Sequence, residues 1–98
     1  MKIIVLKFGG TSVGNLEKIK KVSKIIISYV KKKYKVIVVS SAMSGVTNEL
    51  LLKTNKIAQN FPDDEKDVIL STGEQVSCAL IAGKLRDFGF KSRSWLSW

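Results

Sequence analysis

The chain has 98 residues, of which 45% are hydrophobic, and its 17 lysine and arginine residues against 8 acidic ones give a formal net charge of +9. This length suits one small domain or part of a larger one, and the apolar content excludes a chain that is disordered by composition. With Cys78 as the one cysteine and no histidine, a disulfide framework and the usual transition-metal clusters are excluded, and we expect no metal site built from side chains.

The apolar runs, the first residues and the cysteine content indicate the cellular compartment. No apolar stretch approaches the roughly 20 residues that a membrane-spanning helix needs. The first residues lead directly into a strand-like run and lack the small-residue cleavage site of a signal peptide. A single cysteine suits a reducing compartment. We therefore expect a cytoplasmic protein without a membrane partner.

The first half of the chain has the pattern of a βαβ unit. Residues 3–8 (IIVLKF) and 36–40 (VIVVS) are apolar, β-branched runs typical of buried strands in a parallel sheet. Between them, residues 16–30 repeat apolar side chains at helical spacing, and Asn15 is placed to cap the start of that helix. The order strand, glycine-rich turn, helix, strand predicts an α/β fold.

The second half is predicted to be mainly helical. A helix is expected over 48–60, followed by a short helix over 65–70 and a longer one over 73–88, with Gly89 as its stop. Residues 90–96 (FKSRSWL) are expected to begin a third strand.

Residues 5–14 (VLKFGGTSVG) join the first strand to a glycine-rich turn. The spacing does not fit the common phosphate loop, because Asn15 stands where that motif needs a lysine, and it does not fit the dinucleotide fingerprint either. Here Lys7 precedes the glycines. Gly9 and Gly10 would still let phosphate oxygens approach the backbone amides closely. The alternative is an ordinary βα turn with a surface lysine, and the spacing alone leaves both open.

Two later segments carry polar side chains that are expected to lie near this turn. Residues 40–50 (SSAMSGVTNEL) follow the second strand, and parallel strands end at the same edge of a sheet. Their hydroxyls suit a small polar anion, although Ser44 or Thr47 could instead cap the next helix. Residues 70–80 (LSTGEQVSCAL) contain Glu74, which could contact a substrate ammonium group or merely complete a capping box.

Together, KFGGTSVG (7–14), SSAMSGVTN (40–48) and STGEQVS (71–77) resemble the aspartokinases of the amino acid kinase family in order and separation. The tail GFKSRSWLSW (89–98) is similar to the next strand and turn of that family. The resemblance implies a partial three-layer α/β/α sandwich with a mainly parallel sheet. Residues 1–98 would then form the N-terminal part of the catalytic domain, without a regulatory ACT domain.

The resemblance also implies a reaction. Aspartokinases transfer the γ-phosphoryl group of ATP to the side-chain carboxylate of L-aspartate, which gives 4-phospho-L-aspartate on the route to lysine, threonine and methionine. By this resemblance, Lys7 would be catalytic and would stabilise charge on the moving phosphoryl group. Phe8, Gly9 and Gly10 would bind the nucleotide phosphates together with Lys7.

The substrate side follows from the same resemblance. Thr47 and Glu74 would contact L-aspartate, and Ser41 would help to line its pocket. A carboxylate acceptor is already ionised at neutral pH, so the reaction needs no general base and the lack of histidine is no obstacle. Mg²⁺ would be held mainly by the nucleotide phosphates and by water.

Members of this family are several times longer than this chain, and most of their nucleotide site lies in the remainder. We therefore expect a truncated fragment that is inactive alone. One alternative is half of a split kinase that a second chain completes, with the unfinished sheet as the interface. The other is a small basic module that binds anions or nucleic acid. No aromatic–basic interleaving indicates a base-stacking platform, so no nucleic-acid partner is expected.

Overall fold

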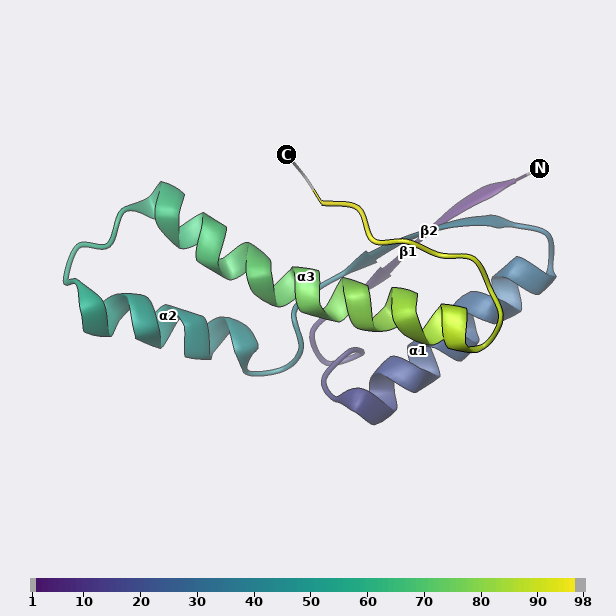
Figure 1. The fold of residues 1–98 in the computed structure, drawn as a ribbon, viewed down its shortest axis with the longest axis horizontal. Coiled ribbons are helices and arrows are strands. Elements are labelled where there is room, and N and C mark those ends of the chain that lie inside the picture. Colours follow the sequence, from purple (N-terminus) through teal and green to yellow (C-terminus); the bar gives the residue numbers. More distant parts are fainter. Residues whose placement is uncertain (1, 97–98) are drawn as a thin grey trace.

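The computed structural model describes residues 2–96, so the last two residues of the predicted tail, 97–98, lie outside it. The elements in chain order are β1 (Ile3–Phe8), α1 (Leu16–Lys31), β2 (Lys35–Ser40), α2 (Val46–Ile57) and α3 (Asp63–Asp87), shown in Figure 1. The strands pair in parallel, with Ile3 opposite Lys35 and Phe8 opposite Ser40. The predicted βαβ unit and the α/β class are therefore confirmed.

One face of the sheet packs against a single layer of helices. Alternate strand residues such as Leu6 and Val38 point to this face, as the two-residue period of a strand requires. The buried cluster that they contact comes from the turn after β1, from α1 and from α3: Val13, Ile19, Val22, Ile26, Ile81 and Leu85. The core therefore lies between the sheet and these two helices.

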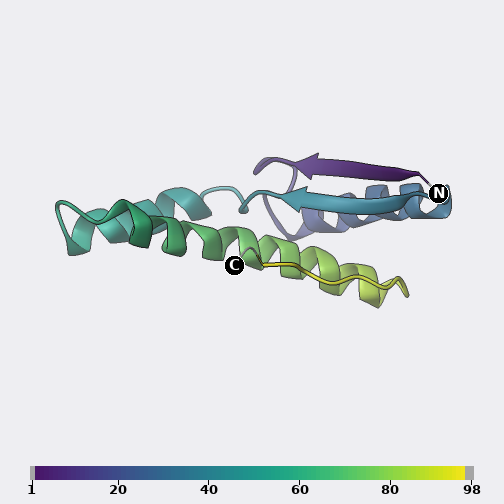
Figure 2. The same cartoon turned by 90° about the horizontal axis from the view of Figure 1, so that it is seen from above.

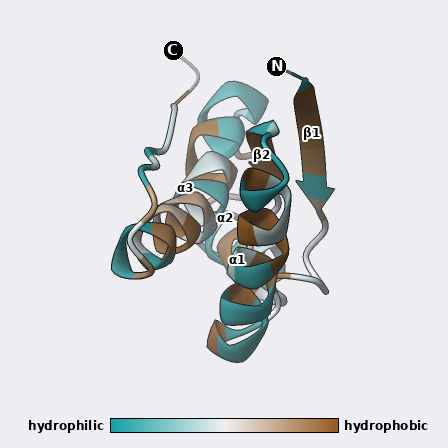
Figure 3. Cartoon of the chain, turned by 90° about the vertical axis from the view of Figure 1, so that its right-hand side faces the viewer, coloured by the Kyte–Doolittle hydropathy of each residue, from teal (hydrophilic) through white to brown (hydrophobic). Residues whose placement is uncertain are grey.

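The other face of the sheet is uncovered within the described residues. Ile3, Val5, Ile37 and Val39 alternate with the inward-facing residues, and each is between 47% and 64% exposed. Figure 3 shows how much of both strands is hydrophobic. Parallel sheets are ordinarily covered on both faces. The predicted three-layer sandwich is thus represented by two layers, the sheet and one layer of helices.

Helix α2 and the first half of α3 form a helical hairpin that extends beyond the sheet (Figures 1 and 2). The molecule is correspondingly elongated, with extents of 50 × 27 × 18 Å. Helix α2 follows Gly45, whose φ of 81° is left-handed, and it ends before Ala58. The helix predicted over 48–60 therefore exists, but it begins and ends a few residues earlier than expected.

Helix α3 is one helix of 25 residues where two were predicted. Ser71 and Thr72, at the expected break, lie inside it, and their hydroxyls donate to the carbonyl oxygens of Val68 (2.7 Å) and Ile69 (2.6 Å). Such local bonds satisfy the hydroxyls without ending a helix. The alternative explanation of Glu74 as part of a capping box is therefore wrong, because Glu74 lies in the middle of α3. No described helix, α3 included, has the length and apolar content to cross a membrane.

The strand predicted over 90–96 is not formed. Gly89, with a φ of 90°, ends α3 as predicted. The segment beyond it is then tied back to α3 by side chains. The hydroxyl of Ser92 donates to the carbonyl of Ala82 (2.6 Å), and Nε of Arg86 donates to the carbonyl of Ser92 (2.7 Å).

Candidate functional site

Three segments meet at the carboxyl end of the two strands. They are the turn 9–14 after β1, the segment 40–46 after β2, and the middle of α3 at 73–77. Figure 1 shows the arrowheads of both strands pointing toward this region. The hydroxyl of Ser44 donates to the carbonyl oxygen of Gly10 (3.2 Å), which joins the first two segments directly. The three motifs thus lie together, as the parallel topology predicted.

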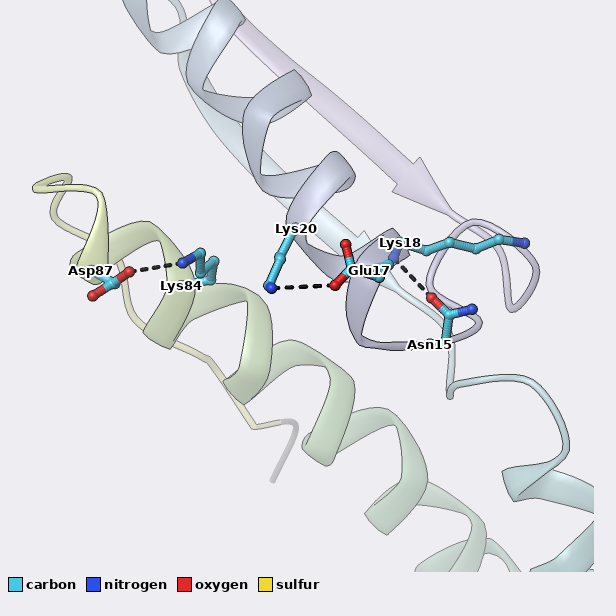
Figure 4. A network of polar contacts seen from close by, with 6 residues as sticks. All are labelled: Asn15, Glu17, Lys18, Lys20, Lys84 and Asp87. Carbon is cyan, nitrogen blue, oxygen red and sulfur yellow. Dashed lines mark hydrogen bonds and ion pairs between the residues drawn. The ribbon is translucent and has the colours of Figure 1, made fainter.

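The turn after β1 is closed by its own backbone. The carbonyl oxygen of Gly9 accepts from the amides of Ser12 (3.0 Å) and Val13 (3.2 Å), and Val13 is fully buried. Asn15 then caps α1 as predicted, since its Oδ1 accepts from the amide of Lys18 at 2.9 Å (Figure 4). The turn is therefore fixed at both ends, by the core and by the cap.

The two ion pairs of the described chain each join neighbours on one helix. Figure 4 shows Glu17 with Lys20 (3.3 Å) and Lys84 with Asp87 (2.8 Å). The Lys84 ammonium holds the pKa of the Asp87 carboxyl below its usual range. Pairs of this exposed kind contribute little to stability. Neither of them involves Lys7, so no carboxylate of residues 2–96 neutralises that lysine through an ion pair.

Lys7 lies near the end of β1, opposite Val39, and its side chain is exposed on the uncovered face of the sheet. Phe8 follows with the opposite orientation and packs against the core. The carbonyl oxygen of Phe8 accepts from the amide of Ser41 (3.0 Å). Lys7 therefore brings positive charge to this edge, and so does Lys18, whose Nζ donates to the carbonyl oxygen of Thr11 in the turn (2.9 Å). The Phe8 ring belongs to the core, and only its backbone borders the site.

The glycines of the turn differ in what surrounds them. A Cβ on Gly9 would meet no atom within 4 Å, whereas a Cβ on Gly10 would lie 3.3 Å from the carbonyl oxygen of Ala42. A Cβ on Gly14 would lie 2.9 Å from Oγ of Ser44. Gly10 and Gly14 therefore allow the two loops to approach each other. Gly9 is the one of these three glycines that has open space on its Cβ side.

Helix α2 begins without a side-chain cap. Gly45 precedes it, and the amide of Glu49 donates to the carbonyl of Gly45 (3.0 Å). The alternative left open by the sequence, that Ser44 or Thr47 caps this helix, is wrong. The Ser44 hydroxyl bonds to Gly10 instead, and Thr47 is an exposed residue of the first helical turn. Within residues 2–96, the Thr47 hydroxyl therefore does not cap α2.

A buried serine connects the middle of α3 to the end of β2. Ser77 is fully buried, and its hydroxyl donates to the carbonyl oxygen of Ser41 at 2.6 Å. Oγ of Ser77 also accepts from the hydroxyl of Ser40 (3.3 Å) and lies 3.0 Å from the carbonyl oxygen of Glu74. One hydroxyl therefore contacts the backbone of two predicted substrate residues, Ser41 and Glu74.

Gly73 provides the shape that this connection needs. A Cβ at this buried glycine would lie 2.9 Å from Cγ1 of Val46 and 3.1 Å from Cβ of Ala42. Gly73 and Ser77 are four residues apart, so they share one face of α3. Sequence reasoning missed both residues. Their small side chains at helical spacing inside a single motif are the signal that could have revealed them.

The thiol of Cys78 reports on the charge beside this contact. Burial raises the pKa of the Cys78 thiol, a hydrogen bond from the Ser40 backbone opposes the rise, and the nearby Glu74 carboxylate adds to it. Glu74 is exposed, yet its charge lies close enough to act on Cys78, one helical turn away. Glu74 and Cys78 are four residues apart and therefore share one face of α3.

The predicted site residues fall into two groups. Lys7 and Gly9 lie at and just beyond the end of β1. Ser41, Thr47 and Glu74 are exposed residues at the contact between α3 and the segment 40–46: Ser41 accepts from Ser77, and the other two follow Val46 and Gly73 directly. The arrangement offers a cation and a glycine with open space beside it in one group, and hydroxyls with a carboxylate in the other.

Known proteins are similar to this sequence along its whole length. A family model described as the amino acid kinase family matches residues 2–97. The aspartokinase of Geobacillus stearothermophilus is 47% identical over 98 residues, which cover 100% of this chain and 24% of that protein. The aspartokinase of Rickettsia conorii is 46% identical over 101 residues, again with 100% of this chain and 25% of that protein covered.

The fold is shared as well. A crystal structure of aspartate kinase from Synechocystis matches with a TM-score of 0.85 and 43% identity, over 88% of this chain and 15% of that chain. This chain spans about a quarter of the length of the curated relatives that it matches. From the family model, the identities and the shared fold together, the chain belongs to the amino acid kinase family.

Proposed function

We propose that this chain is part of an aspartate kinase and supplies the aspartate side of its active site together with one phosphate-binding turn. The reaction is transfer of the γ-phosphoryl group of ATP to the side-chain carboxylate of L-aspartate. The observation that carries the proposal is that three aspartokinase-like motifs, far apart in sequence, meet at one edge of the sheet. The similarity to proteins named aspartokinase supports the choice of substrate.

Lys7 and Gly9 are the residues proposed to meet the nucleotide phosphates. Lys7 is exposed at the end of β1, and the Gly9 backbone has open space around it, so both suit an anion that approaches this edge. Lys7 stabilises the charge that develops as the phosphoryl group moves, which is the main requirement of such transfers. Gly10 and Phe8 shape the turn through their backbones.

Mg²⁺ is proposed to arrive with the nucleotide. Within residues 2–96, no group of three or more acidic, cysteine or histidine residues is placed to hold a metal ion. This donor set fits an ion held by phosphate oxygens and water. When bound, the ion neutralises phosphate charge, while this chain contributes the Lys7 ammonium and the amides of the turn.

The second group of residues is proposed to bind L-aspartate. The Glu74 carboxylate faces the substrate ammonium group, and the hydroxyls of Thr47 and Ser41 donate to its carboxylates. The accepting carboxylate is ionised near pH 7, so it attacks without a general base. Positioning and charge neutralisation are then the contributions that the protein makes.

A second candidate function is that of one half of a split kinase, which a second polypeptide completes. The uncovered face of the sheet favours this candidate. Four large apolar side chains lie on that face, where a parallel sheet ordinarily has a covering layer. We propose that the 98-residue chain alone does not turn over, and that its complement supplies the rest of the nucleotide site. We place the assembled enzyme in the cytoplasm.

The test is a chimera in which residues 1–98 replace the matching segment of the G. stearothermophilus aspartokinase, 47% identical to it. Acyl phosphate formed from ATP, Mg²⁺ and L-aspartate is trapped with hydroxylamine. We expect turnover within about tenfold of the parent enzyme. A folded chimera that forms no acyl phosphate contradicts the proposal. Robust turnover by the 98-residue chain alone contradicts the claim that this chain is inactive without its complement.

A further inference from the structure

We propose that Ser77 is a positioning residue, which holds the segment 40–47 against α3 and so sets the spacing between Glu74 and the other aspartate contacts. Ser77 itself does not touch substrate. The proposal rests on the function proposed above and assigns a role to a residue for which the family resemblance implies none.

The first support is the hydrogen bonding of the Ser77 hydroxyl. It joins α3 to the end of β2 across 36 residues of sequence, through a 2.6 Å bond to the carbonyl oxygen of Ser41. Its oxygen also accepts from Ser40, whose own side chain is buried. Because Ser77 is fully buried, no water replaces its hydroxyl without rearrangement of the segment.

The second support is the close approach of the backbone at Gly73. Any side chain there would displace Val46 or Ala42, since even a Cβ would lie 2.9 Å and 3.1 Å from them. A Cβ on Gly83, which lies further along the same helix, would meet no atom within 4 Å. The tight contact therefore belongs to the part of α3 that carries Glu74.

The consequence concerns the geometry of the substrate group. Gly73 and Ser77 lie on either side of Glu74 in sequence. Ser77 bonds to Ser41 itself, and Gly73 lies against Val46, the residue before Thr47. If this contact loosens, the carboxylate and the hydroxyls no longer hold one spacing. Misplacement by about 1 Å is enough to weaken a binding site substantially.

The enzymatic test uses Ser77→Ala in the chimera. We expect the KM for L-aspartate to rise about five- to tenfold, as the loss of a buried hydrogen bond implies, with kcat and the KM for ATP changed by less than about twofold. The matched control is Ser23→Ala. Ser23 is also fully buried, but its hydroxyl donates to the carbonyl oxygen of Ile19 in its own helix (2.9 Å) and, within residues 2–96, joins no two elements.

The two serine variants separate positioning from general stability. Ser23→Ala is expected to leave the KM for L-aspartate unchanged. An equal rise in both variants, or none in Ser77→Ala, overturns the positioning role while leaving the proposed function intact. An inactive parent chimera overturns the proposed function instead.

A glycine pair on α3 gives a second comparison. Gly73→Ala is expected to raise the KM for L-aspartate as Ser77→Ala does, because the added methyl pushes the segment 40–47 away. Gly83→Ala is expected to leave it unchanged, since that position is open. A Gly73→Ala chimera with the parental KM overturns the proposal.

The 98-residue chain itself provides a test that needs no activity. Amide hydrogen exchange is measured at Ser41 and Val46, whose amides donate to Phe8 and Met43. We expect Ser77→Ala to reduce protection at these two amides about fivefold more than in α1. Ser23→Ala is expected to show no such selective loss. A uniform loss along the chain in both variants contradicts the positioning role.

Discussion

Lys7 is the side chain on which the proposed phosphoryl transfer depends most directly. Its position near the end of β1, its exposure and its lack of an ion pair within residues 2–96 leave its charge to act on an incoming anion. Phe8, beside it, is turned to the core by the period of the strand. Lys7 is thus exposed toward the proposed site, and Phe8 packs the strand against the core.

Lys7→Ala in the chimera is therefore expected to lower kcat about a hundredfold or more, because the lost charge matters most as the phosphoryl group moves. The KM for L-aspartate is expected to change by less than about threefold. Steady-state kinetics with trapped acyl phosphate measure both. Lys24→Ala, an exposed lysine of α1, is the control. A rise in KM with unchanged kcat would show that Lys7 only binds substrate.

The reactivity of the Cys78 thiol can be used to detect the charge of Glu74 nearby. Because burial and the Glu74 carboxylate raise the pKa of the thiol, its alkylation by iodoacetamide is expected to accelerate at a higher pH than that of a free thiol. Glu74→Gln is expected to lower that midpoint, since a negative neighbour is removed. Glu65→Gln, in the first turn of α3, is expected to leave it unchanged.

The same shift fixes the sign of its effect on stability. A thiol with a raised pKa in the folded state contributes stability that is full below the ordinary thiol pKa and is lost as the pH rises through the raised value. The free energy of unfolding is therefore expected to fall at alkaline pH. An alkylation midpoint that does not respond to Glu74→Gln would contradict the placement of the carboxylate beside Cys78.

Among the elements, those specified by local pattern were predicted correctly. The strands β1 and β2 follow from runs of β-branched residues, and α1 follows from its apolar period and from the Asn15 cap. The boundary of α3 was not predictable in this way. Ser71 and Thr72 favour a break by propensity, but the helix continues because their hydroxyls bond locally and the residues beyond them dock on the β2 end.

The site shows the same division between local and distant causes. That the motifs meet at one edge of the sheet could be predicted, because parallel strands end together. That Ser77 joins them could not, because the bond to Ser41 spans 36 residues and depends on how closely Gly73 lets α3 approach. The prediction of a third strand at 90–96 was wrong for a similar reason, because side-chain hydrogen bonds to α3 hold that segment in another conformation.

The Asn15 cap allows a test at the level of the element. Asn15→Ala removes the acceptor for the amide of Lys18 and is expected to lower the free energy of unfolding by about 1 kcal/mol. Urea denaturation of the 98-residue chain measures it. Asn48→Ala, an exposed position inside α2, is expected to change stability by less than about 0.5 kcal/mol. Equal effects of the two substitutions would show that the cap contributes nothing.

For the whole molecule, the uncovered face of the sheet is the dominant feature. A two-stranded sheet is marginal without further packing, and this one carries exposed apolar residues on the side opposite α1. A chain that spans about a quarter of its relatives leaves room for a partner segment there. The uncovered face is therefore the surface that we propose a further segment covers.

Complementation in trans tests that surface. The 98-residue chain is mixed with a polypeptide that contains the rest of the G. stearothermophilus aspartokinase without the matching segment, and association is followed by light scattering. A 1:1 complex is expected. Val5→Lys, on the uncovered face, is expected to weaken it about tenfold or more, whereas Leu52→Lys, equally exposed at 56% but on α2, is not. Equal effects, or no complex, would contradict this role of the face.

The central proposal is that this chain supplies the aspartate side of an aspartate kinase. The most direct test is the acceptor specificity of the chimera that carries residues 1–98. Acyl phosphate is measured with hydroxylamine for L-aspartate and for L-glutamate at equal concentrations. We expect robust formation with L-aspartate and at least about tenfold less with L-glutamate, whose extra methylene would not fit the same spacing. Equal use of both, or none of L-aspartate by a folded chimera, would contradict the proposal.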